Sequence, residues 1–590
     1  MTNVIELMPD PEAAELVRPC YRVYDYPTIL AGEKLRPGVW FHGTRRDGEG
    51  GEVPTDEWLC GPLHVDAVTR AECNGADYGR LLRFRNLDNR WLTWAMPGEL
   101  LAGRPEGILS VLFGMGLEID YQRRAQVPRY IASQHPKKRV TAATATGWHG
   151  PELFITPTGN IGKGDAIYQA ESAADGDYGE AGTLEGWREG IGALLPGNPI
   201  LQLTVGTALA GPLLYHLGIH TGGGFHLLWD SSNGKSTAVE CASSVWGHAK
   251  HFTLKWNATA NGLEGIAALR NDSLLALDEL GIADPRYVGE VVYAVADGTG
   301  KQRAGRSSAA RKVRRWRVMM LSSGEITLET KMAEAGKRVR AGQEVRLVTV
   351  SAGRTFGAWD NLHSHPTGAS FSDALKKAST THYGHAGPAF VLALIDSGEL
   401  GDLPAMLEAI KAHFPAEPGQ PARVAERFAI VALALELAAG MGVLPLEKNE
   451  GIRSMVELFN GWRAGRGEGP SEDRQILKAI ADFIDRHGSS RFQSIKNYAG
   501  GDEKVRDRAG WLEDRPEEDR VYLFYRSGLE EATKGFDPAR VVRALDSVGA
   551  ITKRKPGKNQ AEKRLPDGSK PYLYHIDPAR LTLGDSEPGG

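Results

Sequence analysis

Mostly apolar runs alternate with helix-like segments through the middle of the chain. Four of these runs, at residues 225–229, 274–277, 318–321 and 347–350, have the length of strands and few polar positions. Strands that are buried on both faces have this composition, whereas half-buried strands alternate apolar and polar residues. Together with the helical segments between them, the runs predict a parallel α/β core over residues 191–355.

The regions on either side of this core have other patterns. Residues 1–190 contain short alternating runs such as LLRFRNLDNRWLTWAM (81–96), which predict a mixed or β-rich N-terminal region. Residues 356–463 are helical and rich in alanine, as expected of a helical lid. The stretch AGRGEGPS at residues 464–471 has the composition of a linker.

A last domain is predicted over residues 472–578, followed by a polar tail at 579–590. Asp537–Ile551 starts with an Asp-Pro helix signal and repeats apolar residues at helical spacing. Six basic residues and one acid follow at 553–564, before the strand-like YLYHI. A helix followed by a basic two-stranded flap is the outline of a winged helix, a module that commonly binds DNA. A small packing domain with solvated lysines explains the pattern equally well.

Charge and cysteine content limit the classes of function. The net charge of −4 excludes a globally basic surface, so any nucleic-acid contact is confined to local patches. The four cysteines lack C-x-x-C spacing, which indicates neither a zinc site nor a disulfide framework. The N-terminus does not resemble a signal peptide, so we expect a cytoplasmic protein. Residues 428–446 are the best membrane candidate, but Glu436 interrupts them and a buried lid helix is favoured.

A polar loop that closes on Gly-Lys-Ser follows the first apolar run, and a helix-compatible segment comes next. In such a loop the backbone N–H groups and the helix N-terminus bind phosphates, the lysine reaches the β- and γ-phosphates, and the serine reaches Mg²⁺. Trp229 stands where the first glycine of G-x-x-x-x-G-K-[ST] is expected. The tripeptide alone is common by chance, but its context favours a site for ATP and Mg²⁺. The predicted binding residues are Asp230, Ser231, Ser232, Asn233, Gly234, Lys235, Ser236 and Thr237.

Two adjacent carboxylates end the second apolar run. Asp278 lies 43 positions after Lys235 and is predicted to hold Mg²⁺ together with Ser236. Glu279 is predicted to orient and deprotonate the attacking water. An apolar run followed by two acids is more often a strand that enters a solvated turn. Its pairing with the loop favours the catalytic interpretation.

A basic segment separates the second and third apolar runs. Residues 301–317 contain eight basic residues and no acid. Such a run is usually a solvated face, but its position predicts a hairpin that contacts phosphates of DNA or of a neighbouring subunit's nucleotide. The third run ends in Ser322 and Ser323, where a polar residue can sense the γ-phosphate. The predicted DNA-binding residues are Lys301, Arg303, Arg306 and Arg311.

Six motifs resemble segments of the bacterial family called domain of unknown function 927. The resemblance covers about Tyr21–Val443 and is most specific over Trp229–Arg346. Members occur on phages and mobile elements, and the family is similar to the minichromosome-maintenance-like hexameric DNA helicases of the AAA+ class. The resemblance implies a P-loop AAA+ core in a homo-hexamer that acts on DNA with other replication proteins of the element. The motifs are WDSSNGKSTA, LDELGIADP, ADGTGKQRAGR, LSSGE, EAGKRVRAGQEVRLV and RVAERFAIVA.

The same resemblance implies roles for single residues. Ser323 takes the position of the γ-phosphate sensor. Arg346 stands where AAA+ ATPases place an arginine that reaches into the adjacent subunit's site, which adds a catalytic residue to Lys235 and Glu279. Arg423 opens a long apolar helix and is implied to contact nucleotide from the lid. The alternatives are Arg338 and Arg340 for Arg346, and Arg427 for Arg423.

The predicted function is an ATP-driven DNA helicase. One alternative is a remodeller or loader that opens a DNA-bound protein with the same ATP chemistry and separates no strands. Another is a DNA-binding scaffold that has lost hydrolysis because of Trp229. A small-molecule P-loop kinase is disfavoured because it needs neither the basic segment nor the additional domains.

Overall fold

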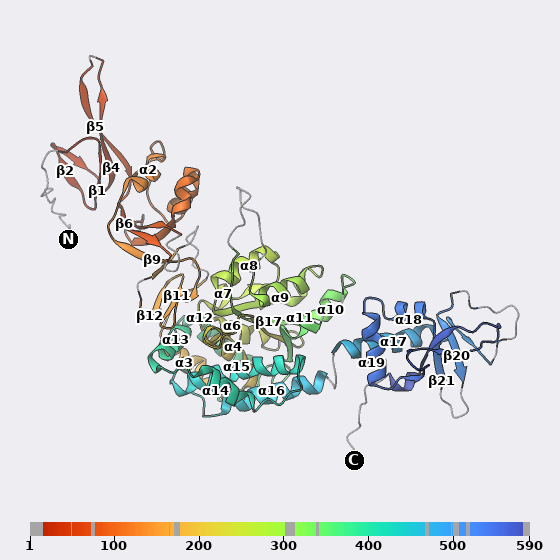
Figure 1. Cartoon of the computed structure of the whole chain (residues 1–590). Coiled ribbons are helices and arrows are strands. Elements are labelled where there is room, and N and C mark those ends of the chain that lie inside the picture. Colours follow the sequence, from red (N-terminus) through yellow and green to blue (C-terminus); the bar gives the residue numbers. More distant parts are fainter. Residues whose placement is uncertain are drawn as a thin grey trace. The chain divides into compact units, whose positions relative to one another are not determined.

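The chain folds into two compact units (Figure 1). Unit 1 contains Met1–Val339, Val345–Ala416 and Ala422–Leu458, and unit 2 contains Arg340–Glu344, Glu417–Pro421 and Phe459–Gly590. The structure is a computed structural model. It describes residues 16–581 other than 49, 72–76, 165, 170–176, 301–312, 338–340, 467–470, 497, 499–504, 506 and 515–519.

Alternating burial organises the first strands of unit 1, as the sequence predicts. Leu82 and Phe84 of β7 (Gly79–Arg85) are fully buried, while Arg83 between them and Arg85 after them are partly exposed. Strand β7 pairs antiparallel with β8 (Trp91–Pro97). The buried side chains pack against two helices, α1 (Pro105–Gly114) and α2 (Gln126–Ser133). The earlier strands are β1 (Cys20–Tyr24), β2 (Thr28–Leu30), β3 (Glu33–Leu35), β4 (Gly38–Arg46), β5 (Glu52–Cys60) and β6 (Leu63–Arg70).

These strands belong to several small sheets. The larger sheet has the order β13-β9-β6-β7-β8 and combines parallel and antiparallel pairs. Strands β1, β4 and β5 form a separate antiparallel sheet, and so do β10, β11 and β12. The strands after α2 are β9 (Arg139–Ala143), β10 (Gly147–Trp148), β11 (Leu153–Thr156), β12 (Gly159–Gly162) and β13 (Ala166–Tyr168).

A parallel sheet of five strands forms the centre of unit 1. Its order is β15-β16-β17-β14-β18, and every neighbouring pair is parallel. The four predicted apolar runs all form strands of this sheet, so the α/β prediction is confirmed. The strands are β14 (Gly223–Leu228), β15 (Leu254–Lys255), β16 (Ser273–Asp278), β17 (Val318–Gly324) and β18 (Leu347–Ser351).

Helices cover both faces of this sheet, which explains why its strands lack alternation. Leu275 and Leu277 share a core with α8 and α9, whereas Leu274 and Ala276 point to the opposite face and are equally buried. Helices α4 and α6 pack against β16 and β17. The helices of this core are α3 (Leu184–Gly190), α4 (Pro199–Ala210), α5 (Leu213–His216), α6 (Lys235–Ser243), α7 (Ala249–Phe252), α8 (Ala260–Leu269), α9 (Val288–Asp297) and α10 (Leu328–Ala333).

The helical stretch that follows β18 contains the best membrane candidate of the sequence. Helix α15 (Gln420–Gly440) is largely buried, and its Val431 and Leu435 lie where a side chain on Gly206 of α4 would be. None of the helices in the described part of the chain has both the length and the apolar character that a membrane crossing needs. The other helices here are α12 (Gly368–Thr381), α13 (Ala386–Ser397), α14 (Leu403–Lys411) and α16 (Glu450–Arg466).

Unit 2 consists of short helices packed on one sheet. The sheet has the order β19-β20-β21-β24-β22, with β23 also paired to β24. Its core joins Ile480, Phe524, Leu545 and Leu581, so the start of the predicted polar tail is folded. The predicted linker is helical at both ends, because α16 reaches Arg466 and α17 starts at Ser471. The elements are α11 (Ala341–Glu344), α17 (Ser471–His487), β19 (Phe492–Ser494), β20 (Gly510–Asp514), β21 (Arg520–Phe524), α18 (Arg526–Ala532), α19 (Pro538–Ser547), β22 (Ile551–Lys553), β23 (Ala561–Glu562) and β24 (Tyr572–Ile576).

A buried ion pair fastens the central sheet at the edge where its strands begin. Asp272 has no exposed surface, and its carboxylate accepts hydrogen bonds from Arg317 Nε at 2.6 Å and Nη2 at 2.9 Å. The backbone N–H of Trp148 donates to the same carboxylate at 3.0 Å. Burial raises the pKa of Asp272, and the Arg317 guanidinium opposes that shift. The pair therefore joins β16, the residue before β17 and the β10 strand.

We expect Asp272→Ala to destabilise unit 1 strongly, because it leaves the mostly buried Arg317 guanidinium without its carboxylate. Removing one partner of a buried pair costs about 3–5 kcal/mol. Thermal unfolding followed by calorimetry measures the effect. Asp284→Ala is the matched control, since Asp284 pairs with Arg286 at the surface. Equal melting temperatures for the two variants would contradict the importance of the buried pair.

Candidate functional site

The polar residues predicted to bind nucleotide meet at one edge of the central sheet. Strands β14, β16 and β17 are parallel, so their carboxyl ends lie side by side. At these ends are the loop from Trp229 to Gly234, the acids Asp278 and Glu279, and Ser323 near the end of β17. Ligands of open parallel sheets bind at this carboxyl edge.

The loop passes directly into helix α6. Gly234 has φ of 93°, a left-handed conformation that glycine adopts without a steric cost, and it is the N-cap of α6. No side chain caps this helix start. The N–H groups of the first turn are therefore donors suited to an anion.

A second segment holds the loop from the side. The backbone N–H of Ala358 donates to the Asn233 carbonyl at 2.7 Å. The buried Trp359 ring lies so close to Gly234 that a Cβ there would be 2.8 Å from it. Trp359 is itself fixed by a hydrogen bond from its Nε1 to Ser372 Oγ at 2.9 Å. Residues far along the chain thus define the conformation of the loop.

Trp229 does not prevent the turn. Its indole lies against Gly353, where a Cβ would come within 2.4 Å of the ring. The side chain is 42% exposed, and the backbone still leads from β14 into the loop. A tryptophan is therefore compatible with the loop because glycine stands at position 353.

Lys235 lies under the loop. Its ammonium donates to the Trp229 carbonyl at 2.7 Å and also to the Asp230 carbonyl. Burial lowers the pKa of Lys235, and the charges of Glu325 and Glu279 partly oppose the shift. The side chain is 7% exposed, so its charge is directed at the loop rather than at bulk solvent.

The Asp278 carboxylate collects donors from three elements. Ser236 Oγ at the start of α6 donates to Oδ1 at 3.1 Å, and Ser323 Oγ at the end of β17 donates to the same atom. Lys255 Nζ from β15 lies 2.6 Å from Oδ2. Burial acts to raise the pKa of Asp278, but the hydrogen bonds from Lys255 and Ser323 outweigh it and lower the pKa below its usual value. The carboxylate therefore stays ionised at neutral pH, as a metal ligand must be.

Glu279 follows directly and turns away from the strand. Its φ of 66° is in the left-handed region, which a non-glycine residue adopts at an energetic cost. The side chain is half-buried, and its charge acts on the Lys235 ammonium. The two acids therefore have different surroundings, as different roles require.

A buried hydrogen-bond network lies next to the carboxyl edge of the sheet. His226 Nδ1 forms a hydrogen bond of 2.9 Å with Ser322 Oγ. Its Nε2 forms another, of 3.0 Å, with the Ile326 carbonyl. Trp256 Nε1 donates to the same Ser322 hydroxyl at 2.9 Å. Of the two serines at the end of β17, Ser322 thus belongs to the core, and Ser323 alone contacts the acid.

The predicted arginines lie elsewhere. Arg346 precedes β18 at the edge where the strands begin, and its guanidinium lies 3.9 Å from the Tyr293 ring centre. Arg427 donates to the carbonyls of Val345 and Gly222 at that same edge. Arg423 is exposed one helical turn before Arg427 on α15, and its contact with nucleotide stays a prediction.

The predicted DNA-binding residues Lys301, Arg303, Arg306 and Arg311 lie outside the described residues, as do the alternatives Arg338 and Arg340. The flanks of the basic segment are described. Gly300 N–H donates to the Arg314 carbonyl at 2.9 Å, and Trp316 N–H donates to the Gly298 carbonyl at 2.9 Å. Thr299 and Arg315 form an antiparallel bridge. The two ends of the segment therefore pair as the base of a hairpin does.

Lys255 and the segment from Gly357 to Trp359 are site residues that the sequence did not reveal. Lys255 lies on a strand of only two residues, which is too short for a periodic signal. The hydrogen bond from Ala358 spans many residues of sequence. Neither contact therefore leaves a signal in the local sequence.

Comparison with known proteins agrees with this architecture. The profile of the family described as "Domain of unknown function (DUF927)" matches residues 32–315. The resemblance that the motifs indicate is thus confirmed over this shorter range. The sequence has no match among the curated proteins.

Solved structures extend the likeness to the whole chain. One is the structure named "SCCmec type IV Cch - active helicase", with a TM-score of 0.66 and 17% sequence identity. The alignment covers 96% of this chain and 99% of that chain. At this identity the likeness concerns the fold.

We expect the buried His226 to make stability depend on pH. Burial lowers its pKa from 6.5 to about 4, so the folded protein prefers the neutral ring. This stabilisation is complete above pH 6.5 and is lost as pH falls toward about 4. A shift of this size corresponds to roughly 3 kcal/mol, because one pKa unit corresponds to about 1.36 kcal/mol.

Melting temperatures of the wild type and of His226→Gln between these pH values measure the effect. The difference between the two proteins should shrink as the pH falls. Parallel profiles would show that His226 does not titrate in the unfolding transition.

Proposed function

We propose that the chain is an ATP-dependent DNA helicase of the AAA+ class. The observation that carries the proposal is the convergence of Lys235, Ser236, Asp278 and Ser323 at the carboxyl edge of the parallel sheet. Glu279 follows Asp278 directly in the chain. These residue types divide phosphate binding, metal binding and base catalysis among themselves.

The residues present fit ATP and Mg²⁺. Lys235 and the uncapped N-terminus of α6 would hold the β- and γ-phosphates. Ser236 and the ionised Asp278 would hold Mg²⁺, which typically binds one or two carboxylates together with phosphates. The metal would neutralise charge that develops on the phosphates, while Glu279 accepts the proton of the attacking water. Asp230, Ser231, Ser232 and Asn233 would line the loop, and Thr237 follows Ser236 in the first turn of α6.

The position of β17 supports a sensor role for Ser323. Strand β17 is hydrogen-bonded to both β14 and β16. Its last residues therefore lie between the phosphate loop and the acid pair. The Ser323 hydroxyl contacts Asp278, and from this place it would also reach the terminal phosphate of a bound nucleotide.

Two observations support DNA as the substrate. Gly300 and Arg314, on either side of the residues that the structure does not describe, pair through a backbone hydrogen bond. The basic composition between them favours contact of Lys301, Arg303, Arg306 and Arg311 with DNA phosphates. The similar solved structure is named "SCCmec type IV Cch - active helicase", and its fold extends over nearly all of this chain. We propose that the activity serves the replication of a phage or mobile element, as the resemblance to the family implies.

Unit 2 supports a winged-helix assignment. Helices α17, α18 and α19 pack on a sheet in which β21, β24 and β22 are neighbours and antiparallel. The predicted helix is present from Pro538 to Ser547, with Asp537 accepting a hydrogen bond from the Arg540 N–H as its N-cap. The basic flap lies between β22 and β24, as in a wing.

Arg346 would make each proposed ATP site a shared site between two subunits. Arg346 lies at the edge opposite its own phosphate loop, so it would act only on the nucleotide of an adjacent subunit. A homo-hexameric ring would complete each site in this way.

A forked-DNA unwinding assay with ATP and Mg²⁺ tests the function, with phosphate release measured in the same reaction. A helicase separates strands and hydrolyses ATP without a partner. A remodeller or loader hydrolyses ATP and leaves the fork intact. A scaffold does neither, and either of these two results would overturn the proposal.

We expect Lys235→Ala to abolish ATP hydrolysis and unwinding, because it removes a charged contact to the phosphates. Glu279→Gln should still bind ATP but hydrolyse it about 10²–10⁴-fold more slowly, since it keeps the shape and loses the base. Nucleotide binding by fluorescence and phosphate release measure the two effects. Glu329→Gln, on the exposed start of α10, is the matched control. Undiminished hydrolysis by both site variants would refute the assignment.

We expect Arg346→Ala to bind ATP normally and to hydrolyse it roughly 10³-fold more slowly. Mixing this variant with Lys235→Ala should restore part of the activity, because some interfaces then pair an intact loop with an intact arginine. Arg453→Ala, an exposed arginine of α16, should behave as the wild type. Hydrolysis by Arg346→Ala at the wild-type rate, or no recovery in mixtures that exchange subunits, contradicts the trans role.

A further inference from the structure

A helix-turn-helix and the basic flap form one face of unit 2. Helices α18 and α19 are joined by a turn that contains Gly535, whose φ is 96°. We define the flap as residues 553–564. Its Arg554 donates two hydrogen bonds to the Asp546 carboxylate of α19, which fastens the flap to the helix.

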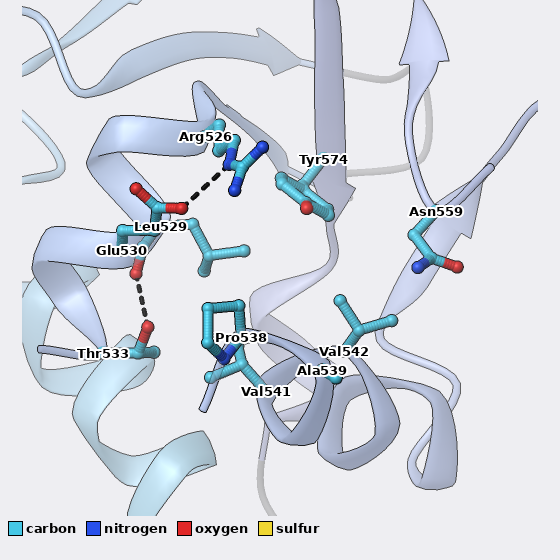
Figure 2. A pocket seen from close by; sticks show the side chains of 10 residues that line it. All are labelled: Arg526, Leu529, Glu530, Thr533, Pro538, Ala539, Val541, Val542, Asn559 and Tyr574. Carbon is cyan, nitrogen blue, oxygen red and sulfur yellow. Dashed lines mark hydrogen bonds and ion pairs between the residues drawn. The ribbon is translucent and has the colours of Figure 1, made fainter. Parts of the chain in front are cut away.

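A cavity of about 250 Å³ opens on this face, between the two helices, β24 and the flap. Its floor is apolar and includes Leu529, Val541 and Val542. Figure 2 shows Tyr574 and Asn559 on the side opposite to the α18 residues. The rim is polar, because Arg526 Nε donates to Glu530 Oε1 at 2.8 Å and the Asn559 amide approaches from the flap.

The flap beside the cavity carries a net positive charge. Of the flap's basic residues, Arg554 and Lys563 pair with Asp546 and Glu513. The other four are exposed, and Glu562 is the single acid of the flap. Lys558 is held above the Tyr572 ring at 4.2 Å, so its charge stays on this surface. The four exposed cations are Lys553, Lys555, Lys558 and Arg564.

We propose that the cavity of unit 2 binds one unpaired base of DNA while the flap cations bind the adjoining phosphates. The excess of positive charge favours a polyanion over a protein segment, in a chain whose net charge is −4. The site is distinct from the proposed ATP site and from the basic segment of unit 1.

The size and chemistry of the cavity fit a base. Pockets for drug-sized ligands start at about 300 Å³, so this cavity fits a single flat ring system. Unstacked bases lie on aromatic rings and guanidinium planes, and Tyr574 and Arg526 offer both. The Asn559 amide has a donor and an acceptor, which is what hydrogen bonding to a base edge requires.

Full-length protein without nucleotide tests this inference in two measurements. The first is ultraviolet cross-linking to single-stranded DNA that contains 4-thiothymidine, with the cross-linked peptide identified by mass spectrometry. The second is affinity for the same strand by fluorescence anisotropy over a range of salt concentrations. Both use Val542→Glu, Asn559→Asp and the double variant Lys555→Glu/Lys558→Glu.

We expect cross-links to peptides that contain Tyr574 or α19. Val542→Glu should abolish them and bind roughly tenfold to hundredfold more weakly, the range of one stacked base. Asn559→Asp, at an exposed position where folding is not at risk, should also weaken binding. The double lysine variant should make the salt dependence shallower, by about 0.7 in the log–log slope for each phosphate that no longer has a cation beside it. Lys478→Glu, exposed on α17 and away from the cavity, is the matched control.

Cross-links confined to other segments, with all variants equal to Lys478→Glu in affinity, would overturn the inference. That result is also the one expected if the cavity holds an apolar side chain of a partner protein. ATP hydrolysis by the variants reports separately on unit 1. If the protein binds DNA at the cavity but does not unwind forks, the inference about the cavity stands and only the proposed helicase function is contradicted.

Discussion

The carboxylate of Asp278 is the point at which the central sheet and the candidate site depend on each other. It is nearly buried, and an ionised group in that position requires hydrogen-bond donors. The donors come from α6, β15 and β17, which are separate in sequence. One charge therefore aligns three elements, and the parallel strands bring them to the same edge. The geometry of the site is in this sense a property of the whole sheet.

The parts of this arrangement that local sequence determines were predictable. Strands β14, β16, β17 and β18 are continuous apolar runs because helices cover both of their faces, and that composition is visible without any tertiary information. The loop comes directly after the first of these strands, and the acid pair stands at the end of the second. Their meeting at one edge needs only the rule that parallel strands share a carboxyl edge.

The remaining contacts depend on packing between distant segments. Lys255 approaches Asp278 because β15 pairs with β16, and a two-residue strand gives no pattern. Arg427 was one candidate for contacting nucleotide, yet it binds carbonyls at the opposite edge, since the rotation of α15 on the sheet decides where its guanidinium points. Trp359 fixes Gly234 from beyond β18. Rules that use only neighbouring residues cannot predict contacts between residues so far apart in the chain.

The contact between Trp229 and Gly353 has an evolutionary consequence. The indole occupies the space of any side chain at position 353, so the two positions are sterically one unit. A lineage that acquired glycine at 229 would release the constraint at 353, whereas a side chain gained first at 353 would expel the ring and distort the loop. Substitutions at these sites are therefore ordered in time, and among related chains the two positions should vary together.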